Sequence, residues 1–568
     1  MTLYQVTQTT DNGNGDTVGT LSYAILQANR NAGTDAIELK TNVRITSVMK
    51  RLPDSDIVII GNDKTVSGDA NNNGQTDNED LRPFFIKSGN VKFYDLTITN
   101  STAKGGDSRL GGGGAGMGGG MFIYGGDVSL SNVTFSNNLA QGGSTTEQGL
   151  GNGGGGMFGN GGFGGGGGGL FASGSNTNGG YGGSGNYSSN DRFFGKGGDS
   201  GGYGFGAAGG NGGFGAGGGN ARNGGNGGFG GGGGYGRERG GNGGYGGGGA
   251  YGYGRLGEGG YGGGFGAGSG AGMGGAMFIR SGKLTLNGVN LNNNSANSGS
   301  QGNGSKGLGG ALFIMQRTEN SNDNNQGMPT TLPTVVSEGA QPTYSGNSAS
   351  DDTGASNNND NVFGTVNTVT DSKAGNDTIN GTNNSDILDG GAGNDTINGL
   401  GSNDILIGGQ GNDNLNGGAG SDILYGGLGS DNLNGGAGND SLIGGAGSDR
   451  FIFNSGQAFT SAGVGLDTVS DFVQGTDKIA LSKSTFTGIG SAVGNGFSQN
   501  NEFDVVDNLN LVTDLFEGLG AANIIYNRQD RGLYYVDDGL FGGLTNPTKF
   551  ATLQGNFTPT ASDFVITT

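Results

Sequence analysis

The chain has 568 residues, of which 140 are Gly and 31% are hydrophobic, which excludes a single compact apolar core. Its net charge of −20 disfavours nucleic acid and anionic membranes as partners and favours cations. Because Cys, His and Trp are absent, disulfides and the common thiol and imidazole chemistries are excluded, and we expect no enzyme.

The first element that the sequence predicts is a short amphipathic helix. Thr20 is a suitable N-cap, and Gly33 is a suitable stop. The apolar stripe consists of Leu21, Ala24, Ile25 and Ala28. Such a helix is expected to cap the first turn of a stack of strands. Residues 1–30 show no general export signal, and no apolar run approaches the ~20 residues of a membrane span, so no membrane insertion is expected.

The segment "DANNNGQTDNED" has the order of oxygen-bearing residues found in a helix-flanked calcium loop. Gly74 lies at its sixth position, where such loops turn sharply. The candidate ligands are Asp69, Asn71, Asn73, Gln75, Asp77 and Asp80. No helices are expected on either side of it. The two interpretations are a bound Ca²⁺ and a solvated acidic loop.

Three segments, 84–103, 121–140 and 277–296, align without gaps and read as copies of one unit. Their coinciding apolar positions are Ile86/Ile123/Ile279, Val91/Val128/Leu284, Phe93/Leu130/Leu286, Leu96/Val133/Val289 and Ile98/Phe135/Leu291. Stacking these positions inward predicts a parallel β-helix with a strand spacing of ~4.8 Å. Asn100, Asn137 and Asn293 also coincide, and we expect their side chains to hydrogen-bond from one turn to the next. A fourth copy begins at 309–314 and resumes at 344–349.

Two small motifs recur in these copies. The motif Gly-Gly-small-apolar occurs as "GGGM" (118–121), "GGAM" (274–277) and "GGAL" (309–312). Phe135 is followed three residues later by Asn138, with Leu291 to Asn294 and Tyr344 to Asn347 as variants. This pattern resembles the repeats of polymorphic outer-membrane adhesins, although the first copy lacks both motifs. The resemblance implies a right-handed β-helix that is displayed outside a cell.

Between the second and third copies lies a Gly-rich segment, 142–275. It contains the spaced aromatic residues Phe163, Phe214, Phe229, Tyr235, Tyr245 and Tyr261. One interpretation is a flexible low-complexity insertion. Another is an ordered bundle of polyglycine helices with three residues per turn and with aromatic side chains at its rim. A third, an RNA-binding Arg-Gly segment around Arg237 and Arg239, is opposed by the few Arg residues and by the negative net charge.

After an expected polar linker over 351–372, nine aspartates recur at nine-residue spacing. They are Asp377, Asp386, Asp395, Asp404, Asp413, Asp422, Asp431, Asp440 and Asp449. An apolar residue follows each aspartate by two positions, so each nonapeptide reads as a Gly-rich turn and a short strand. With two nonapeptides per coil, carboxylates stack at ~4.8 Å and repel by about 1 to 3 kcal/mol per pair. We therefore expect folding to require a cation, and oxygen ligands select Ca²⁺.

The nonapeptides "GGQGNDNLN" (408–416) and "GGAGSDILY" (417–425) closely resemble the RTX calcium-binding repeat. The segment after Asp449 resembles the capping domain of type I secreted RTX proteins, with Asp467, Asp471, Phe472, Asp477 and Ile479 in matching places. The final "SDFVITT" is similar to the uncleaved C-terminal signal of that export route. The resemblance implies a secreted protein.

The sequence thus predicts an all-β protein: a right-handed parallel β-helix with a Gly-rich insertion, followed by an RTX parallel β-roll and a β-rich C-terminal cap. The expected segments are 1–141 and 276–350 for the β-helix, 142–275 for the insertion, 351–372 for the linker, 373–453 for the roll and 454–568 for the cap. The expected function is that of a secreted calcium-binding structural or adhesive protein of the cell surface or extracellular matrix. Expected partners are calcium ions, further copies in a filament or sheath, and cell-surface polysaccharide. The alternative is a β-helix polysaccharide lyase or epimerase that carries RTX repeats.

Overall fold

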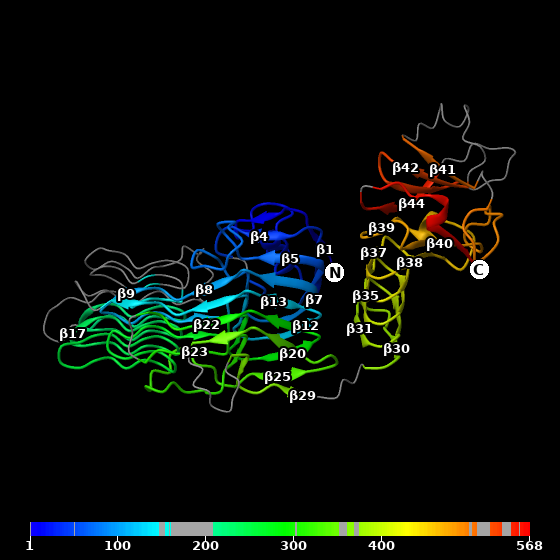
Figure 1. Ribbon diagram of the computed structural model, residues 1–568. Coiled ribbons are helices and arrows are strands. Elements are labelled where there is room, and N and C mark those ends of the chain that lie inside the picture. The colour runs from blue at the N-terminus through cyan, green and yellow to red at the C-terminus, as the bar shows by residue number, and fades with distance from the viewer. Residues whose placement is uncertain are drawn as a thin grey trace. The chain divides into compact units, whose positions relative to one another are not determined.

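The protein was analysed as a computed structural model, which divides into two compact units, Thr2–Val369 and Thr370–Thr568. The structure describes residues 2–49, 52–146, 154–157, 160, 168, 208–300, 304–350, 360–368, 374–498, 502–507, 523–536, 547–555 and 557–568. Within these residues nearly all regular structure is β-strand, arranged mainly in parallel sheets (Figure 1). No helix among them is long and apolar enough to span a bilayer.

The first unit begins with the predicted helix, α1 (Leu21–Ala28). The Thr20 side chain caps it by accepting a hydrogen bond from the Tyr23 N–H at 3.3 Å, and the apolar stripe is buried. The helix packs against β1 (Leu3–Val6) and β3 (Asp35–Leu39). It ends at Ala28 and not at the expected Gly33, because Asn29 closes the last turn through a bond from its N–H to the Ile25 carbonyl at 3.0 Å.

The three aligned copies stack in parallel in the predicted register. Phe93 in β7 (Asn90–Thr99) lies opposite Leu130 in β12 (Asp127–Ser131), which lies opposite Leu286 in β20 (Lys283–Asn287). The same sheet contains β5 (Ile57–Ser67) before these strands, and β25 (Thr334–Ser337) and β29 (Asn367–Thr368) after them. The apolar positions that the alignment identified form its buried core.

A second sheet of this unit carries the other strand of each copy. Its strands are β6 (Phe84–Ile86), β11 (Met121–Ile123), β19 (Met277–Ile279), β24 (Leu312–Ile314) and β28 (Val362–Phe363). A third sheet contains β8 (Thr102–Lys104), β14 (Leu139–Gln141), β22 (Ser295–Asn297) and β27 (Ser348–Ala349). The expected linker is too long, because β28 and β29 pair in parallel with β24 and β25 and so continue the stack to residue 368. Residues 351–359 and 369–372 lie outside the described residues.

An asparagine ladder runs along the stack. In the second and third copies its members follow the expected asparagines by one position. The Asn138 Nδ2 donates to Asn294 Oδ1 at 2.9 Å, Asn294 Nδ2 to Asn347 Oδ1 at 3.0 Å, and Asn347 Nδ2 to Asn361 Oδ1 at 3.0 Å. The expected ladder residues instead have φ of 47° (Asn100), 55° (Asn137) and 53° (Asn293). This left-handed conformation suits Asn at a turn and leaves these side chains outside the ladder.

The described part of the Gly-rich segment, 208–275, is an ordered block of extended chains that lies beside the stack (Figure 1). The N–H groups of the consecutive Gly232, Gly233 and Gly234 donate to Gly155, Gly248 and Gly225, at 2.7, 3.0 and 2.8 Å. Three consecutive donors that bond three different neighbours are the pattern of a helix with three residues per turn. This hydrogen-bond pattern favours the polyglycine interpretation over the flexible one for the described residues.

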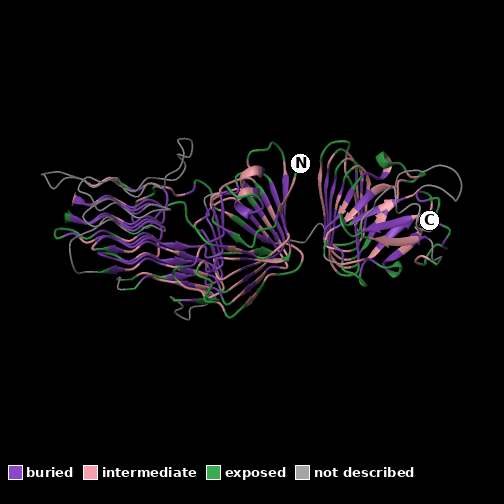
Figure 2. Ribbon diagram, turned by 90° about the horizontal axis from the view of Figure 1, so that it is seen from above, coloured by how far each residue is buried: buried purple, intermediate pink, exposed green. Residues whose placement is uncertain are grey.

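Most of this block is buried although it has few side chains (Figure 2). A Cβ on Gly112 would clash with the carbonyl oxygen of Gly248, so only Gly permits the backbones to approach so closely. Residues near 105–116, before the Gly-rich segment, and 268–275, at its end, also form hydrogen-bonded chains of this block.

Aromatic side chains attach the block to the stack. Phe214, Phe229, Tyr245 and Tyr261 form one column, with centroid separations of 5.2, 5.4 and 5.4 Å. Phe85, Phe122, Phe278, Phe313 and Phe363 form a second column on the sheet of β11, with separations of 4.8, 5.0, 5.0 and 4.8 Å. The columns meet edge to face, as Phe229 and Phe278 do at 6.2 Å and 76°. The expected position at the rim is thus wrong for the first three residues of the first column, which are buried. Phe163 lies outside the described residues.

The second unit consists of two sheets to which successive nonapeptides contribute in alternation. One sheet contains β30 (Thr378–Asn380), β32 (Thr396–Gly401), β34 (Asn414–Ala419), β36 (Asn432–Ala437), β38 (Arg450–Phe453), β40 (Lys478–Ser482) and β45 (Phe564–Thr567). The other contains β31 (Ile387–Ala392), β33 (Ile405–Gln410), β35 (Ile423–Leu428), β37 (Ser441–Ala446), β39 (Asp467–Val469), β44 (Thr548–Leu553), β43 (Gly532–Tyr535), β42 (Ile524–Asn527) and β41 (Phe503–Val506).

All pairs within the roll are parallel, and residues 18 apart lie opposite one another, as Leu415 and Leu433 do. One apolar side chain from each nonapeptide fills the narrow space between the sheets. The later strands add the larger aromatic core of the cap, which includes Phe486 and Phe550. The last strand, β45, pairs with β40, and its Phe564 and Ile566 side chains are buried.

Candidate metal centre

The aspartate ladder forms two rows along the roll, each with an aspartate every 18 residues. The Oδ1 of each aspartate accepts a hydrogen bond from the backbone N–H of the aspartate 18 residues earlier. The distance is 2.8 Å from Asp413 N to Asp431 Oδ1, and also from Asp422 N to Asp440 Oδ1. The same bond joins seven successive pairs, from Asp377–Asp395 to Asp431–Asp449, at 2.7 to 3.0 Å. One carboxylate oxygen per residue is therefore used by the fold.

The second oxygen has no such role. The Oδ2 atoms of Asp404, Asp413, Asp422, Asp431 and Asp440 are buried and have no hydrogen-bond partner. The cost of burying an unpaired carboxylate oxygen is large, so these five atoms require an explanation. A metal ion that binds Oδ2 supplies one.

Burial of these carboxyls raises their pKa values. The pKa rises to about 6 for Asp413 and about 7 for Asp422, Asp431 and Asp449, with desolvation as the largest cause. The backbone N–H on Oδ1 lowers each pKa and so offsets part of this rise, and repulsion between successive aspartates raises the pKa by less than desolvation does. The prediction that stacked charges oppose folding is therefore refined: the main penalty is the loss of hydration.

Glycine backbones make room for the ion beside Oδ2. A Cβ on Gly399 would lie 2.5 Å from Asp404 Oδ2 and 2.5 Å from the carbonyl oxygen of Gly417 in the next coil. The same crowding of one carboxylate and one carbonyl oxygen recurs at Gly390, Gly408, Gly417 and Gly426. Carboxylate and carbonyl oxygens are the ligands that Ca²⁺ prefers. Among the residues that the structure describes, no three acidic side chains converge on one point, so carbonyl oxygens must supply much of each shell.

The first repeats depart from this pattern. Asp377 and Asp386 are only partly buried. The Oδ2 of Asp386 already accepts from the N–H and hydroxyl of Thr382, at 2.7 and 2.8 Å. Asp404 is fully buried, but its turn contains Leu400 and Ser402 at φ of 79° and 70°, where the repeats that carry Asp395 and Asp413 have Gly. In these two repeats Asn384 and Ser402 replace the Gly that stands two residues before each of the other ladder aspartates, so the altered oxygen and the strained turn accompany a change in the sequence.

Two further ladder members were not recognised as such in the sequence. Asp467 Oδ1 accepts from Asp440 N at 3.0 Å, and Asp477 Oδ1 accepts from Asp449 N at 2.9 Å. Both side chains are buried, and desolvation raises both pKa values. They follow their hydrogen-bond partners by 27 and 28 residues instead of 18. The sequence signal that could have identified them is an aspartate at the start of a predicted strand.

The second candidate site, 69–80, lies in the other unit, between β5 and β6, and has no flanking helices, as expected. Asp69 and Asp80 are buried, Asp77 is partly exposed, and Asn71, Asn73 and Gln75 are exposed. The side chains of this loop and of the roll lie in different units.

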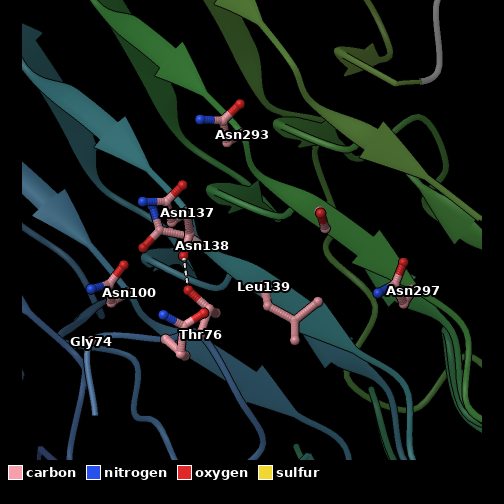
Figure 3. Close-up of a pocket in the computed structure, with 10 residues that line it drawn as sticks. Gly74, Thr76, Asn100, Asn137, Asn138, Leu139, Asn293 and Asn297 are labelled. Carbon is pink, nitrogen blue, oxygen red and sulfur yellow. Dashed lines mark hydrogen bonds between the residues drawn. The ribbon is translucent and has the colours of Figure 1, made fainter. Parts of the chain in front are cut away.

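The loop also forms one wall of a polar groove of about 530 Å³ (Figure 3). Its lining residues are Gly74, Gln75, Thr76, Asn100, Asn137, Asn138, Leu139, Asn293, Ser295 and Asn297. Thr76 donates its hydroxyl to the Asn137 carbonyl at 2.6 Å and so connects the loop to the next turn of the stack. The lining offers amide and hydroxyl groups for hydrogen bonding.

Comparison with known protein families identifies the nonapeptide repeats of the roll. Residues 372–406, 398–433 and 425–457 each match the family model of the RTX calcium-binding nonapeptide repeat (4 copies). No curated protein matches the chain. The match covers the ladder and the Gly-rich turns whose carbonyls approach it. The roll is thus a set of RTX calcium-binding repeats, and Ca²⁺ is the ion that this part of the chain binds.

Proposed function

We propose that this protein is a secreted structural or adhesive protein of the cell surface or extracellular matrix, and that calcium folds its roll outside the cell. The observation that carries the proposal is the row of buried, unpartnered Oδ2 atoms in the RTX repeats. Proteins with such repeats are typically secreted. A chain whose roll remains unfolded at low calcium can pass an exporter and then fold in the higher calcium outside.

For the first unit we propose a right-handed parallel β-helix, as in surface adhesins. The parallel register of successive strands and the asparagine ladder support it. The groove beside the ladder supports binding of a neutral, hydroxyl-rich partner such as a cell-surface polysaccharide. The alternative is a lyase or epimerase, and release of new reducing ends from a polysaccharide would support the lyase, since an epimerase does not cleave the chain. A pull-down with neutral and acidic polysaccharides, with reducing ends counted in the same samples, tests both.

We propose type I export through the C-terminal residues. Deletion of 563–568 is expected to retain the chain in the cell, whereas deletion of 2–8 is not. Because Phe564 and Ile566 are buried in β45, the first deletion also damages the cap. The double variant Val565→Ser and Thr567→Ser changes the two partly exposed positions and spares the buried ones. If this variant folds in Ca²⁺ and is exported normally, these positions are not part of an export signal.

We further propose that copies associate through the Gly-rich block. Its surface exposes Tyr253 (77%), Phe265 (53%) and Leu256 (42%), three of the nine large apolar side chains that are exposed among the described residues. Leu256 lies against Gly266, so two of these side chains belong to one turn region. The net charge opposes association, and Ca²⁺ or salt should favour it.

Analytical ultracentrifugation and electron microscopy of the full chain in Ca²⁺ test this association. We expect assemblies for the wild type and monomers for the double variant Tyr253→Ser and Phe265→Ser. The control is Val18→Ser, which removes an apolar side chain of 69% exposure elsewhere in the same unit. If the wild type remains monomeric at high concentration, the protein is an individual adhesin.

A further inference from the structure

The loop 69–80 of the first unit is rich in carboxylate and amide side chains. Its base is closed by a bond from Leu81 N to the Gly68 carbonyl at 2.9 Å, and Gly68 N donates to Thr99 O at 3.0 Å. The loop therefore begins and ends at fixed points on the stack. Between these points it carries carboxylates and amides, and no lysine or arginine.

The two ends of the loop each contribute a buried carboxylate. Asp69 is 6% exposed, and its oxygens accept from Asn73 N at 3.0 Å and from Gly74 N at 2.8 Å. Asp80 is 4% exposed, and its Oδ2 accepts from Asp77 N at 2.7 Å. The other oxygen of Asp80, Oδ1, is buried and has no hydrogen-bond partner. It is the counterpart, in this unit, of the unpartnered Oδ2 atoms in the roll.

The Asp80 carboxyl faces into the loop. Burial and, to a smaller extent, the charges of Asp77 and Asp69 raise its pKa to about 6, so the three carboxylates are close enough to interact electrostatically. The backbone N–H of Ala70 lies near enough to lower this pKa slightly, but it is not at hydrogen-bond geometry to Oδ1. Among the described residues, no lysine or arginine forms an ion pair with any of the three.

The two nearest guanidinium groups are engaged elsewhere. Arg44 Nη1 donates to the Ala70 carbonyl at 2.9 Å. Arg82 is buried over the rings of Phe85 and Phe122 and donates to the Met117 carbonyl. A cation that neutralises the loop must therefore come from solution.

We propose that the loop 69–80 binds one Ca²⁺, with the Asp69 and Asp80 carboxylates as the buried ligands and with Asp77 and the amide oxygens of Asn71 and Asn73 completing the set. All of these are hard oxygen donors, which select Ca²⁺ over softer metals. The Asn71 and Asn73 amide N–H groups donate to Asp77 Oδ2 at 3.0 and 2.7 Å, so these three side chains lie together. Since no three acidic side chains of the described residues converge on one point, binding the ion requires Asp77 and the amide oxygens to turn toward Asp69 and Asp80.

This site has a consequence for the groove. Gly74, Gln75 and Thr76 form its wall, and Thr76 bonds the Asn137 carbonyl (Figure 3). An ion bound within the loop fixes this wall and couples calcium to whatever the groove binds. The site is independent of the RTX repeats, which lie in the other unit.

Hydrogen exchange of the full chain, resolved by peptide, tests the proposal. The chain is compared in chelator and in millimolar Ca²⁺, and the peptides over 68–81 and over the roll are followed separately. We expect Ca²⁺ to slow exchange at least tenfold in 68–81 of the wild type. Asp80→Asn should abolish this protection, while the roll keeps its own calcium response.

The matched control is Glu79→Gln, which removes one charge from an exposed position of the same loop. It should keep the protection. Peptides over β7 report whether Asp80→Asn still folds, and Asp69→Asn serves as a second ligand variant if it does not. No calcium response in 68–81 of the wild type overturns the proposal, as does full protection in both ligand variants. If only the roll lacks a calcium response, the result counts against calcium binding by the RTX repeats and not against the site in this loop.

Discussion

Replacing Asp422 by Asn should change the stability of the roll in opposite directions with and without calcium. Asp422 is 1% exposed, its Oδ1 accepts from Asp404 N at 2.8 Å, and its Oδ2 has no hydrogen-bond partner. Asparagine keeps an acceptor for the Asp404 N–H and removes the charge. Without calcium the variant loses only a buried charge, whereas with calcium it loses a ligand.

The magnitude follows from the environment of the carboxyl. Raising its pKa from 3.8 to about 7 corresponds to about 4 kcal/mol against the ionised form. Water that reaches the open turns screens part of this penalty, so the ionised carboxylate destabilises the folded roll by about 2 kcal/mol. In chelator at neutral pH, where the wild-type roll is at most marginally folded, Asp422→Asn should therefore shift the equilibrium toward the folded roll, which corresponds to a rise in Tm of about 4 to 8 °C. In Ca²⁺ the same variant should have a lower Tm than the wild type and an affinity weaker by about tenfold.

Differential scanning calorimetry of the full chain measures both effects, because the transition of the roll is the one that calcium shifts. Asp389→Asn is the control, since Asp389 is a partly buried aspartate of the same roll outside the ladder. It should change both conditions alike and by little. A variant at Asp422 that is destabilised in chelator as much as in calcium would refute the view that its charge opposes folding.

Four further predictions concern other parts of the chain. Leu400→Gly should stabilise the roll by about 1 kcal/mol in urea unfolding, because it removes a side chain at φ 79°; an unchanged midpoint would contradict the strain. In chelator the roll should be most stable below pH ~4 and should lose stability as the pH rises toward 7. The reason is that the raised pKa values make the folded state bind more protons than the unfolded state. Circular dichroism measured against pH checks this, and a β signal that increases with pH would contradict it. Asn294→Ala should cost about 3 kcal/mol or more, because its buried amide bonds Asn138 and Asn347; calorimetry of the first unit measures the loss. Gly248→Ala should disrupt the Gly-rich block, because a Cβ there clashes with the carbonyl of a neighbouring chain, whereas a Cβ at Gly125 makes ordinary contacts with a hydroxyl at 3.4 Å and a carbonyl oxygen at 3.7 Å. Equal hydrogen exchange of the two variants in 208–275 would argue against close backbone packing.

The strand register was predictable because both repeats have a fixed period and one inward apolar position per strand. The asparagine ladder was misplaced by one residue because two asparagines are adjacent at 137–138 and 293–294. Only the left-handed φ of the first one decides which side chain points along the stack. Sequence spacing alone does not contain this information.

The aromatic column was missed although the sequence contained its signal. The unit Asn-Gly-Gly-aromatic-Gly begins at Asn211, Asn226 and Asn242, and its variant begins at Glu258. Each N–H at these positions donates to the Asn side chain of the preceding unit, as Asn242 N does to Asn226 Oδ1 at 2.9 Å. A period of 15 to 16 residues thus marks one layer of the Gly-rich block. Composition hides this period, because Gly occupies most of the positions between.

The ladder aspartates were predictable because a nine-residue period with a carboxylate has few explanations other than an ion. What the sequence could not separate was the role of the two oxygens of each carboxylate. Oδ1 bonds a backbone N–H, and Oδ2 is left for the ion. Asp467 and Asp477 were missed as ladder members because the chain inserts extra residues before each one and so loses the period.

The central claim is that calcium, and not the polypeptide alone, makes the roll stable. Peptide-resolved hydrogen exchange across 374–453 of the full chain, in chelator and in millimolar Ca²⁺ at neutral pH, tests it most directly. The amides that donate to ladder carboxylates, such as Asp413 N, report the folded coil itself. We predict fast exchange of these amides in chelator and slow exchange in Ca²⁺, with the strands of the first unit unchanged. Equally slow exchange in both conditions would contradict the claim.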